Sequence, residues 1–101
     1  MIVVNAVIET NAANIDAMKA AIQVMEQASQ AEAGCHDYTF SVELNNANIL
    51  RITERWENME ALAAHFQTPH MASFQAAMGA NPPDNVSANF YEATEVTPPG
   101  R

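Results

Sequence analysis

The chain opens with a run of mostly apolar residues that predicts a β-strand over 2–9. Alternate residues of a strand point to opposite faces, so the even positions share one face and Val3, Asn5 and Val7 share the other. Both faces are apolar apart from Asn5, and strands of this kind are usually covered on both sides. We therefore expect a sheet that is covered on both faces.

Apolar residues then recur at spacings of three and four, which is the period of a helix with one buried face. Asn14 is the expected N-cap, and Asp16 lies in the first turn, where the helix dipole favours an anion. Gly34 is expected to end the segment. The pattern predicts a helix from about 14 to about 31, with these inward side chains: Ile15, Met18, Ile22 and Met25.

From 35 to 44 the pattern alternates with period two, which is typical of a half-buried strand. The segment 45–48 favours a hairpin turn, because its Asn residues tolerate positive φ. A third strand is predicted over 49–56. In the second strand, the side chains expected to share one face are His36, Tyr38, Phe40 and Val42.

The second half of the chain contains two helix starts. Asn58 is expected to cap one helix, and Thr68 followed by Pro69 indicates that a further helix begins there. A final strand is predicted over 86–96, and a disordered C-terminal tail over 97–101.

The order of elements, β-α-β-β-α-α-β, predicts an α+β fold with a single domain over 1–96. Right-handed crossovers give a ferredoxin-like four-stranded antiparallel sheet with helices on one face. The second face is expected to carry large apolar groups that the helices leave uncovered. A twofold partner sheet is the simplest cover, so we predict a homodimer that forms an α/β barrel with one apolar pocket per subunit.

Composition narrows the choice of partners. Four Lys+Arg stand against 12 Asp+Glu, which gives a formal net charge of −8. Such a surface repels phosphate groups and anionic lipids, so neither nucleic acid nor membrane is an expected partner. The chain shows no basic segment leading into an apolar run and no long apolar stretch, so the expected location is cytoplasmic.

Candidate chemistry rests on histidines, because the sequence has no Gly-rich phosphate loop, His-Glu-x-x-His, Cys-x-x-Cys or Gly-x-Ser-x-Gly motif. His70 would be the second residue of the restarted helix, where the dipole disfavours imidazolium and favours a neutral proton acceptor. His36 and His65 are the other candidates, and a purely structural role stays open for all three. No two histidines share i, i+4 spacing, so no metal site is predicted. Cys35 is expected to be an inert buried thiol.

Three segments, 32–38, Glu54-Arg-Trp-Glu57 and 64–71, resemble the antibiotic biosynthesis monooxygenase (ABM) family, and within it the small quinol monooxygenases. The resemblance covers roughly 1–96 and is most specific over 54–74. It implies a dimeric barrel that oxidises a quinol or polycyclic phenol with O₂ and without any cofactor. It also implies a substrate pocket between sheet and helices, lined or bordered by Asn5, His36, Tyr38, Trp56, His65, His70 and Phe74. Our hypothesis is that His65 or His70 is the catalytic base.

Two other functions remain open. A non-catalytic dimeric module that binds a small apolar ligand would use the same residues for packing. A haem-degrading branch of the same family uses an Asn, a Trp and a His ligand. Here Asn5 could match the first, but His65 occupies the Trp position, and the ligand position falls near Phe74 or Gln75. The haem-degrading function is therefore the weaker alternative.

Overall fold

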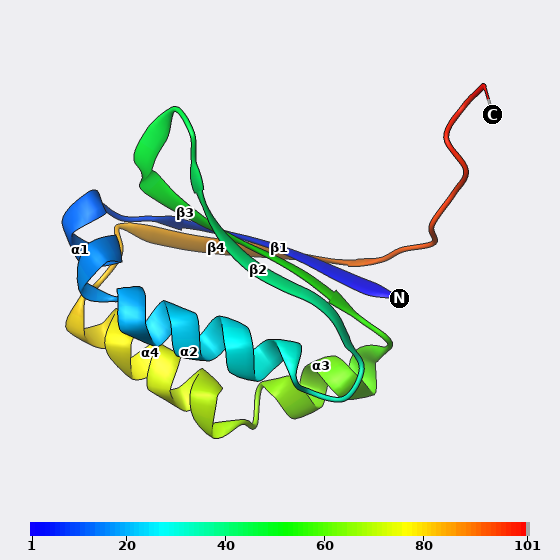
Figure 1. Ribbon diagram of the computed structural model, residues 1–101, viewed down its shortest axis with the longest axis horizontal. Helices are drawn as coiled ribbons and strands as arrows, with labels where there is room; N and C mark the ends of the chain where they lie inside the picture. Colours follow the sequence, from blue (N-terminus) through cyan, green and yellow to red (C-terminus); the bar gives the residue numbers. More distant parts are fainter. Residues whose placement is uncertain (101) are drawn as a thin grey trace.

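The computed structural model describes residues 1–100 and consists of one four-stranded sheet with a layer of helices on one face (Figure 1). The elements are, in chain order, β1 (Ile2–Glu9), α1 (Ala12–Ala17), α2 (Lys19–Gln30), β2 (Cys35–Glu43), β3 (Asn46–Trp56), α3 (Met59–His65), α4 (Pro69–Ala80) and β4 (Asn85–Glu92).

The strands lie in the order β2-β3-β1-β4, and every neighbouring pair is antiparallel. Each half of the chain thus places a helical segment between two strands that do not pair with each other. This arrangement is the ferredoxin-like α+β fold, and it confirms the fold class predicted from the order of elements. Within residues 1–100, no helix is long and apolar enough to cross a membrane.

The core lies between the sheet and the helices. Alternate residues of β1 are buried, as the period-two pattern predicts. Trp56 of β3 and Leu62 of α3 lie deep in this layer, and Phe74 is the buried residue of α4. Met18 and Met25 fill the space beneath the first helical segment.

The first helical segment is two helices rather than one. The predicted N-cap, Asn14, is wrong: Asn11 caps α1, and its side-chain oxygen accepts a hydrogen bond from the Asn14 backbone N–H at 2.8 Å. The helix is interrupted at Met18, whose N–H bonds to the carbonyls of both Asn14 and Ile15. The tighter turn lets the chain change direction while Met18 stays buried.

The second helical segment begins and restarts where the sequence predicts. The Asn58 side chain accepts a hydrogen bond from the Ala61 N–H at 2.9 Å. Thr68 caps α4 with Pro69 at the first helical position, and the Thr68 hydroxyl also donates to the His65 carbonyl at 2.7 Å. This hydroxyl therefore joins the end of one helix to the start of the next.

The final strand is shorter than predicted. It ends at Glu92 and not at Val96, because its partner β1 begins at Ile2, which lies opposite Glu92. After Glu92 the chain leads away from the body of the molecule (Figure 1). Of the predicted tail 97–101, residue Arg101 lies outside the described residues. The hairpin also differs, since β3 already begins at Asn46.

The sheet face opposite the helices carries few of the large apolar groups that the sequence predicts. Val3 and Val7 are half-buried there, and Tyr91 lies opposite Val3. The other side chains on this face of β1 and of its two neighbouring strands are polar or charged: Asn5, Ser87, Asn89, Arg51, Thr53 and Arg55. The expectation was wrong because it extrapolated from β1, which is the most apolar strand, to the whole face.

Exposed apolar surface gathers instead on β4. Val86 and Phe90 pair with Ile8 and Val4, so they share the helix-covered side of the sheet. They are nevertheless 48% and 51% exposed, because no helix packs closely against β4. Tyr91, on the opposite face of the same strand, is also half exposed. Three large apolar side chains are thus exposed along this one edge strand.

Candidate functional site

Two histidines converge where α3 stops and α4 starts. His65 is the last residue of α3, and His70 is the second residue of α4. The interruption between the helices turns the chain, so two residues that would diverge on one continuous helix approach each other. Their ring centroids lie 6.0 Å apart.

Both histidines contact one carboxylate. Glu32 Oε2 lies 2.6 Å from His65 Nδ1 and 2.7 Å from His70 Nε2. In each pair the imidazole N–H donates and the carboxylate oxygen accepts. We call these three side chains the Glu32 cluster.

The turn between α2 and β2 holds Glu32 in place. The Glu32 N–H donates to the Ser29 carbonyl, and the Glu32 carbonyl accepts from the Cys35 N–H. Gly34 in the same turn has φ +81°, and a Cβ there would lie only 2.7 Å from the Ala61 Cβ. Because glycine permits this close approach to α3, the turn brings Glu32 within reach of His65.

The two histidines differ in exposure. The His65 side chain is 1% exposed and the His70 side chain is 16% exposed, so the cluster reaches the surface on the His70 side. With Nδ1 donating to Glu32, a neutral His65 ring carries its lone pair on Nε2. That atom is buried and has no hydrogen-bond partner among the described residues. The His65 ring instead packs against Trp56, at a centroid distance of 4.8 Å, and Tyr38, at 5.2 Å.

A second acidic group lies beneath the cluster. Glu54 of β3 is 7% exposed, and its Oε1 accepts a hydrogen bond from Trp56 Nε1 at 2.9 Å. Burial raises the pKa of Glu54 to about 7; the Trp56 hydrogen bond opposes this rise, and the charge of Glu32 adds to it. Burial is also the main reason that the pKa of Tyr38 is raised, so its phenol stays protonated.

Cys35 is half-buried, and burial, together with the nearby charge of Glu32, raises the pKa of its thiol. A thiol that stays protonated at neutral pH is a poor nucleophile. The structure thus agrees with the expectation of an inert thiol.

Five of the predicted site residues gather between the sheet and the helices. His65 and His70 belong to the Glu32 cluster, and Tyr38 and Trp56 pack against the His65 ring. Phe74 joins this group through Phe40, which lies 5.7 Å from Tyr38 and 5.4 Å from Phe74 between ring centroids. Together these side chains form a continuous aromatic row along the inner face of the sheet: Trp56, Tyr38, Phe40 and Phe74.

Two of the predicted site residues lie elsewhere. Asn5 is exposed on the sheet face opposite the helices. His36 is also exposed, because the register between β2 and β3 shifts from Cys35 to Asp37. This β-bulge breaks the period-two alternation that would have placed His36 beside Tyr38. His36 Nε2 pairs instead with the exposed Glu57 carboxylate at 2.6 Å.

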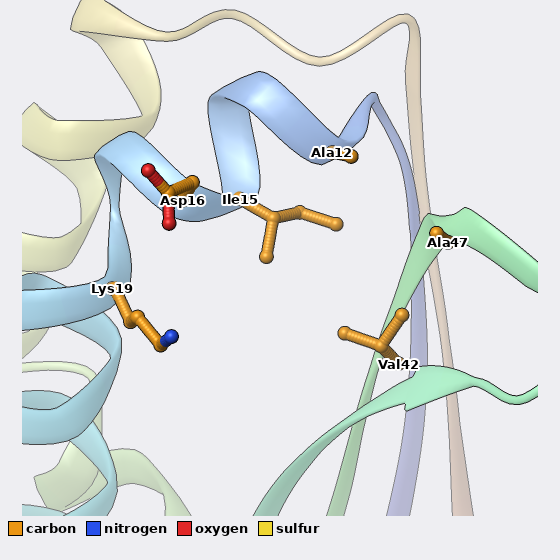
Figure 2. A pocket seen from close by; sticks show the side chains of 6 residues that line it. All are labelled: Ala12, Ile15, Asp16, Lys19, Val42 and Ala47. Carbon is orange, nitrogen blue, oxygen red and sulfur yellow. The ribbon is translucent and has the colours of Figure 1, made fainter.

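The cavity in Figure 2 lies away from the Glu32 cluster. It has a volume of about 280 Å³ and opens between the α1 segment and the β2–β3 hairpin. None of the predicted site residues lines it, and the space beside His65 is filled by the Tyr38 and Trp56 side chains. The lining residues are Ala12, Ile15, Asp16, Lys19, Val42 and Ala47.

Glu32 is the site residue that sequence reasoning missed. It contacts residues that lie 33 and 38 positions away, and no local pattern reports such a pairing. The one local feature that points to Glu32 is its position two residues before Gly34, a glycine whose turn packs closely on α3.

Fold and site together describe a small ferredoxin-like protein with a carboxylate–imidazole cluster between its sheet and its helices. A family model described as antibiotic biosynthesis monooxygenase matches residues 1–77. The chain belongs to this family, and the resemblance of segments 32–38, 54–57 and 64–71 is thereby confirmed. Among curated proteins, no sequence matches the chain.

Solved structures share the fold over almost the whole chain. A Deinococcus radiodurans protein, named provisionally as an antibiotic biosynthesis monooxygenase, has a TM-score of 0.88 at 23% identity and covers 97% of both chains. A Nitrosomonas europaea protein with a similar provisional name has a TM-score of 0.87 at 16% identity, over 94% of this chain and 100% of its own. Rv0793 from Mycobacterium tuberculosis has a TM-score of 0.83 at 22% identity, over 96% and 98%.

Proposed function

We propose that the chain is a monooxygenase that oxidises a quinol or related phenol with O₂ and needs no cofactor. Family membership supports the reaction class. The observation that carries the proposal is the Glu32 carboxylate, which is shared by a buried and a partly exposed histidine. This arrangement can take a proton from a phenol next to an apolar surface.

His70 is the proposed base, because a base must touch the proton that it removes and His70 is the more exposed histidine of the cluster. Its Nε2–H donates to Glu32, so the neutral ring presents the Nδ1 lone pair to the substrate. The Glu32 carboxylate also stabilises the imidazolium that forms. His65 acts as a positioning residue, since its buried Nδ1–H holds the other side of Glu32 Oε2.

The substrate supplies the electrons for this reaction. Once its hydroxyl is deprotonated, the phenolate transfers one electron to O₂, which gives a phenoxyl radical and superoxide. The radicals combine to form a C–O bond, and a proton converts the adduct to a hydroperoxide. The O–O bond then breaks: the outer oxygen leaves as water with the hydrogen of the same ring carbon, and the inner oxygen stays on the ring as a carbonyl. The protein therefore has to bind the ring, remove the proton and limit access of water.

The proposed substrate ring lies against Tyr38, Trp56 and Phe74, next to His70. These aromatic side chains already fill the layer between sheet and helices, so they have to rearrange to admit a ligand. Aromatic side chains suit this role because they stack on flat apolar rings.

The proposal is tested with untagged protein freed of metal by chelation, in air, with menadiol as a representative quinol. O₂ uptake above the spontaneous background and incorporation of ¹⁸O from labelled O₂ into the product would support it. A His70→Ala change should lower the enzymatic rate about 10²-fold or more, as expected for loss of a general base. Glu57→Gln, which alters an exposed histidine–carboxylate pair, is the matched control and should keep the rate. Full activity in His70→Ala contradicts the base assignment.

The proposed active form is a homodimer. The support is the exposed apolar side chains of β4, Val86, Phe90 and Tyr91, on an edge strand that the helices do not cover. Light scattering at micromolar concentration should give twice the chain mass of 11.0 kDa. A monomer at that concentration would contradict this assembly.

A second candidate function is a non-catalytic module that binds a small apolar ligand. The cavity in Figure 2 favours it, because Ile15 and Val42 give that cavity an apolar wall far from the Glu32 cluster. Calorimetric binding of an aromatic ligand that is abolished by Ala47→Trp, without O₂ uptake in either protein, would support this function over the monooxygenase.

A further inference from the structure

The Glu32 cluster offers one carboxylate oxygen and two imidazole nitrogens in a small volume. Glu32 Oε2, His65 Nδ1 and His70 Nε2 all lie within 4.8 Å of one another. We propose that these three atoms bind a divalent transition-metal ion of the Zn²⁺, Co²⁺ and Ni²⁺ class. This goes beyond the proposed oxidation, which uses the same residues in their metal-free state.

The geometry requires little movement. Zn²⁺ lies about 2.0–2.2 Å from its nitrogen and oxygen ligands, so neighbouring ligand atoms of a tetrahedral site lie roughly 3.3 Å apart. The two nitrogen–oxygen distances in the cluster are now 2.6 and 2.7 Å. Replacing the two shared protons by one ion therefore moves each nitrogen away from the oxygen by about 0.6 to 0.7 Å. The two nitrogens already lie within 4.8 Å of each other.

The donor set selects the class of ion. Two imidazoles with one carboxylate suit borderline transition-metal ions, whereas Mg²⁺ and Ca²⁺ prefer sites built from oxygen atoms. The partial exposure of His70 leaves a side through which the ion can enter and at which water can complete its coordination.

The surroundings favour a cation at this place. The backbone on either side of Glu32 is held by hydrogen bonds, and the Thr68 hydroxyl fixes the step between the two helices, so two of the segments that carry ligands are ordered before binding. Glu54 adds a second carboxylate below the cluster, and its charge interacts with that of Glu32. The net charge of −8 raises the local concentration of cations.

His65 offers a further, independent indication. Its ring is buried with Nε2 unpartnered, although buried polar atoms are normally satisfied. When Nδ1 binds a metal ion, the proton of the neutral ring moves to Nε2. In a buried place lined by aromatic rings such as Trp56 and Tyr38, an N–H is tolerated better than a lone pair.

Binding would also switch off the proposed base, a consequence that rests on the proposed function. An ion on His70 Nε2 leaves Nδ1 protonated in the neutral ring, so this nitrogen donates a hydrogen bond and no longer accepts a proton. Zn²⁺ should therefore inhibit quinol oxidation at one ion per chain.

The test is a titration of untagged, chelator-treated protein with Co²⁺, followed by the visible absorption of the bound ion, and then displacement by Zn²⁺. We expect saturation at one ion per chain with intense bands of four- or five-coordinate Co²⁺. Glu32→Gln and His70→Ala should each weaken binding at least about 100-fold, the upper end of the loss caused by outer-shell changes alone. Two variants are used because misfolding of a single variant would also abolish metal binding. Circular dichroism checks that both variants are folded.

His36→Ala is the matched control, because it removes the exposed histidine that pairs with Glu57 and has no second imidazole beside it. It should bind Co²⁺ as tightly as the unaltered chain. Absence of saturable binding overturns the proposal, and so does binding that His36→Ala abolishes while Glu32→Gln and His70→Ala retain it. Binding with the expected variant pattern supports the metal site even if the metal-free protein fails to oxidise any quinol, so the two proposals fail separately.

Discussion

The molecule contains two histidine–glutamate arrangements with the same short contact and very different surroundings. In one, Glu32 joins His65 and His70 between the sheet and the helices; in the other, His36 pairs with Glu57 at the surface. The closest nitrogen–oxygen distance is 2.6 Å in both. The His36 and Glu57 side chains are 45% and 61% exposed, whereas Glu32 is 14% exposed.

The two arrangements have the same contact distance, so the difference in their chemistry comes from burial. Water competes for the surface pair and screens it, so this pair is held only weakly. In the Glu32 cluster, backbone hydrogen bonds hold the turn that carries the carboxylate, and the aromatic rings around His65 keep water away. Only there can one carboxylate set the orientation of two imidazoles.

The largest effect is expected from removing the buried imidazole. His65→Ala should lower the free energy of unfolding by about 4 kcal/mol, because it opens a cavity beside Trp56 and leaves one hydrogen-bonding position of Glu32 empty. His36→Ala should change it by less than about 0.5 kcal/mol. Urea denaturation of both variants measures the difference. Equal losses would show that burial does not distinguish the two sites.

The next effect concerns the buried carboxylate of Glu54. Its pKa is raised to about 7 in the folded chain, so the folded state binds the proton more tightly than the unfolded state does. Stability contributed by this group is present at low pH and is lost as pH rises from about 4.5 towards about 7. Glu54→Gln keeps an acceptor for Trp56 Nε1 and removes the buried charge. It should stabilise the protein by about 3 kcal/mol at pH 8 and very little at pH 4.

The control for this prediction is Glu57→Gln, which should leave the pH dependence of unfolding almost unchanged because its carboxylate is exposed. A Glu54→Gln variant that is no more stable than the unaltered chain at pH 8 would contradict the raised pKa.

A smaller loss, about 2 kcal/mol, is expected from Gly34→Ala. The added Cβ meets the Ala61 Cβ at 2.7 Å and forces an alanine to adopt φ +81°. Removing the opposing methyl group with Ala61→Gly should recover the part of the stability loss that comes from the steric contact. The part that comes from the strained backbone at residue 34 should remain. A double-mutant cycle of unfolding free energies separates the two, and strict additivity would show that the close contact is not the cause.

The smallest effect is expected at the surface pair. Glu57→Gln should change the free energy of unfolding by less than about 0.5 kcal/mol at neutral pH. Thermal unfolding at low and at moderate salt checks this value. A loss of more than 1 kcal/mol would mean that the His36–Glu57 pair is structurally as important as the cluster.

The sequence predicts the fold well because its signals are local and agree with one another. The alternation in β1, the N-cap at Asn58 and the restart at Thr68–Pro69 are readable within a few residues and lie where the structure has them. The boundaries of the elements are harder to predict: no Pro or Gly marks the interruption at Met18. The end of β4 depends on the strand beside it and not on its own residues.

The site could be predicted only in part, because its geometry depends on long-range contacts. The sequence singled out His65 and His70, but the spacing rule that argued against a metal site holds only within one continuous helix. The predicted restart at Thr68–Pro69 separates the two histidines, so the rule does not apply to them, and how closely they approach depends on how the two helices pack. The bulge that turns His36 outward, and the turn that brings Glu32 to the two histidines, are both set by tertiary packing.

The most direct test of the central claim compares quinol oxidation by Glu32→Gln and by Glu57→Gln, measured as O₂ uptake above the spontaneous background in metal-free protein. If Glu32 orients His70 and stabilises its imidazolium, the first change should lower kcat about 10²-fold while the second leaves it within twofold. Equal rates in the two variants would contradict the claim that the buried carboxylate makes this histidine a base.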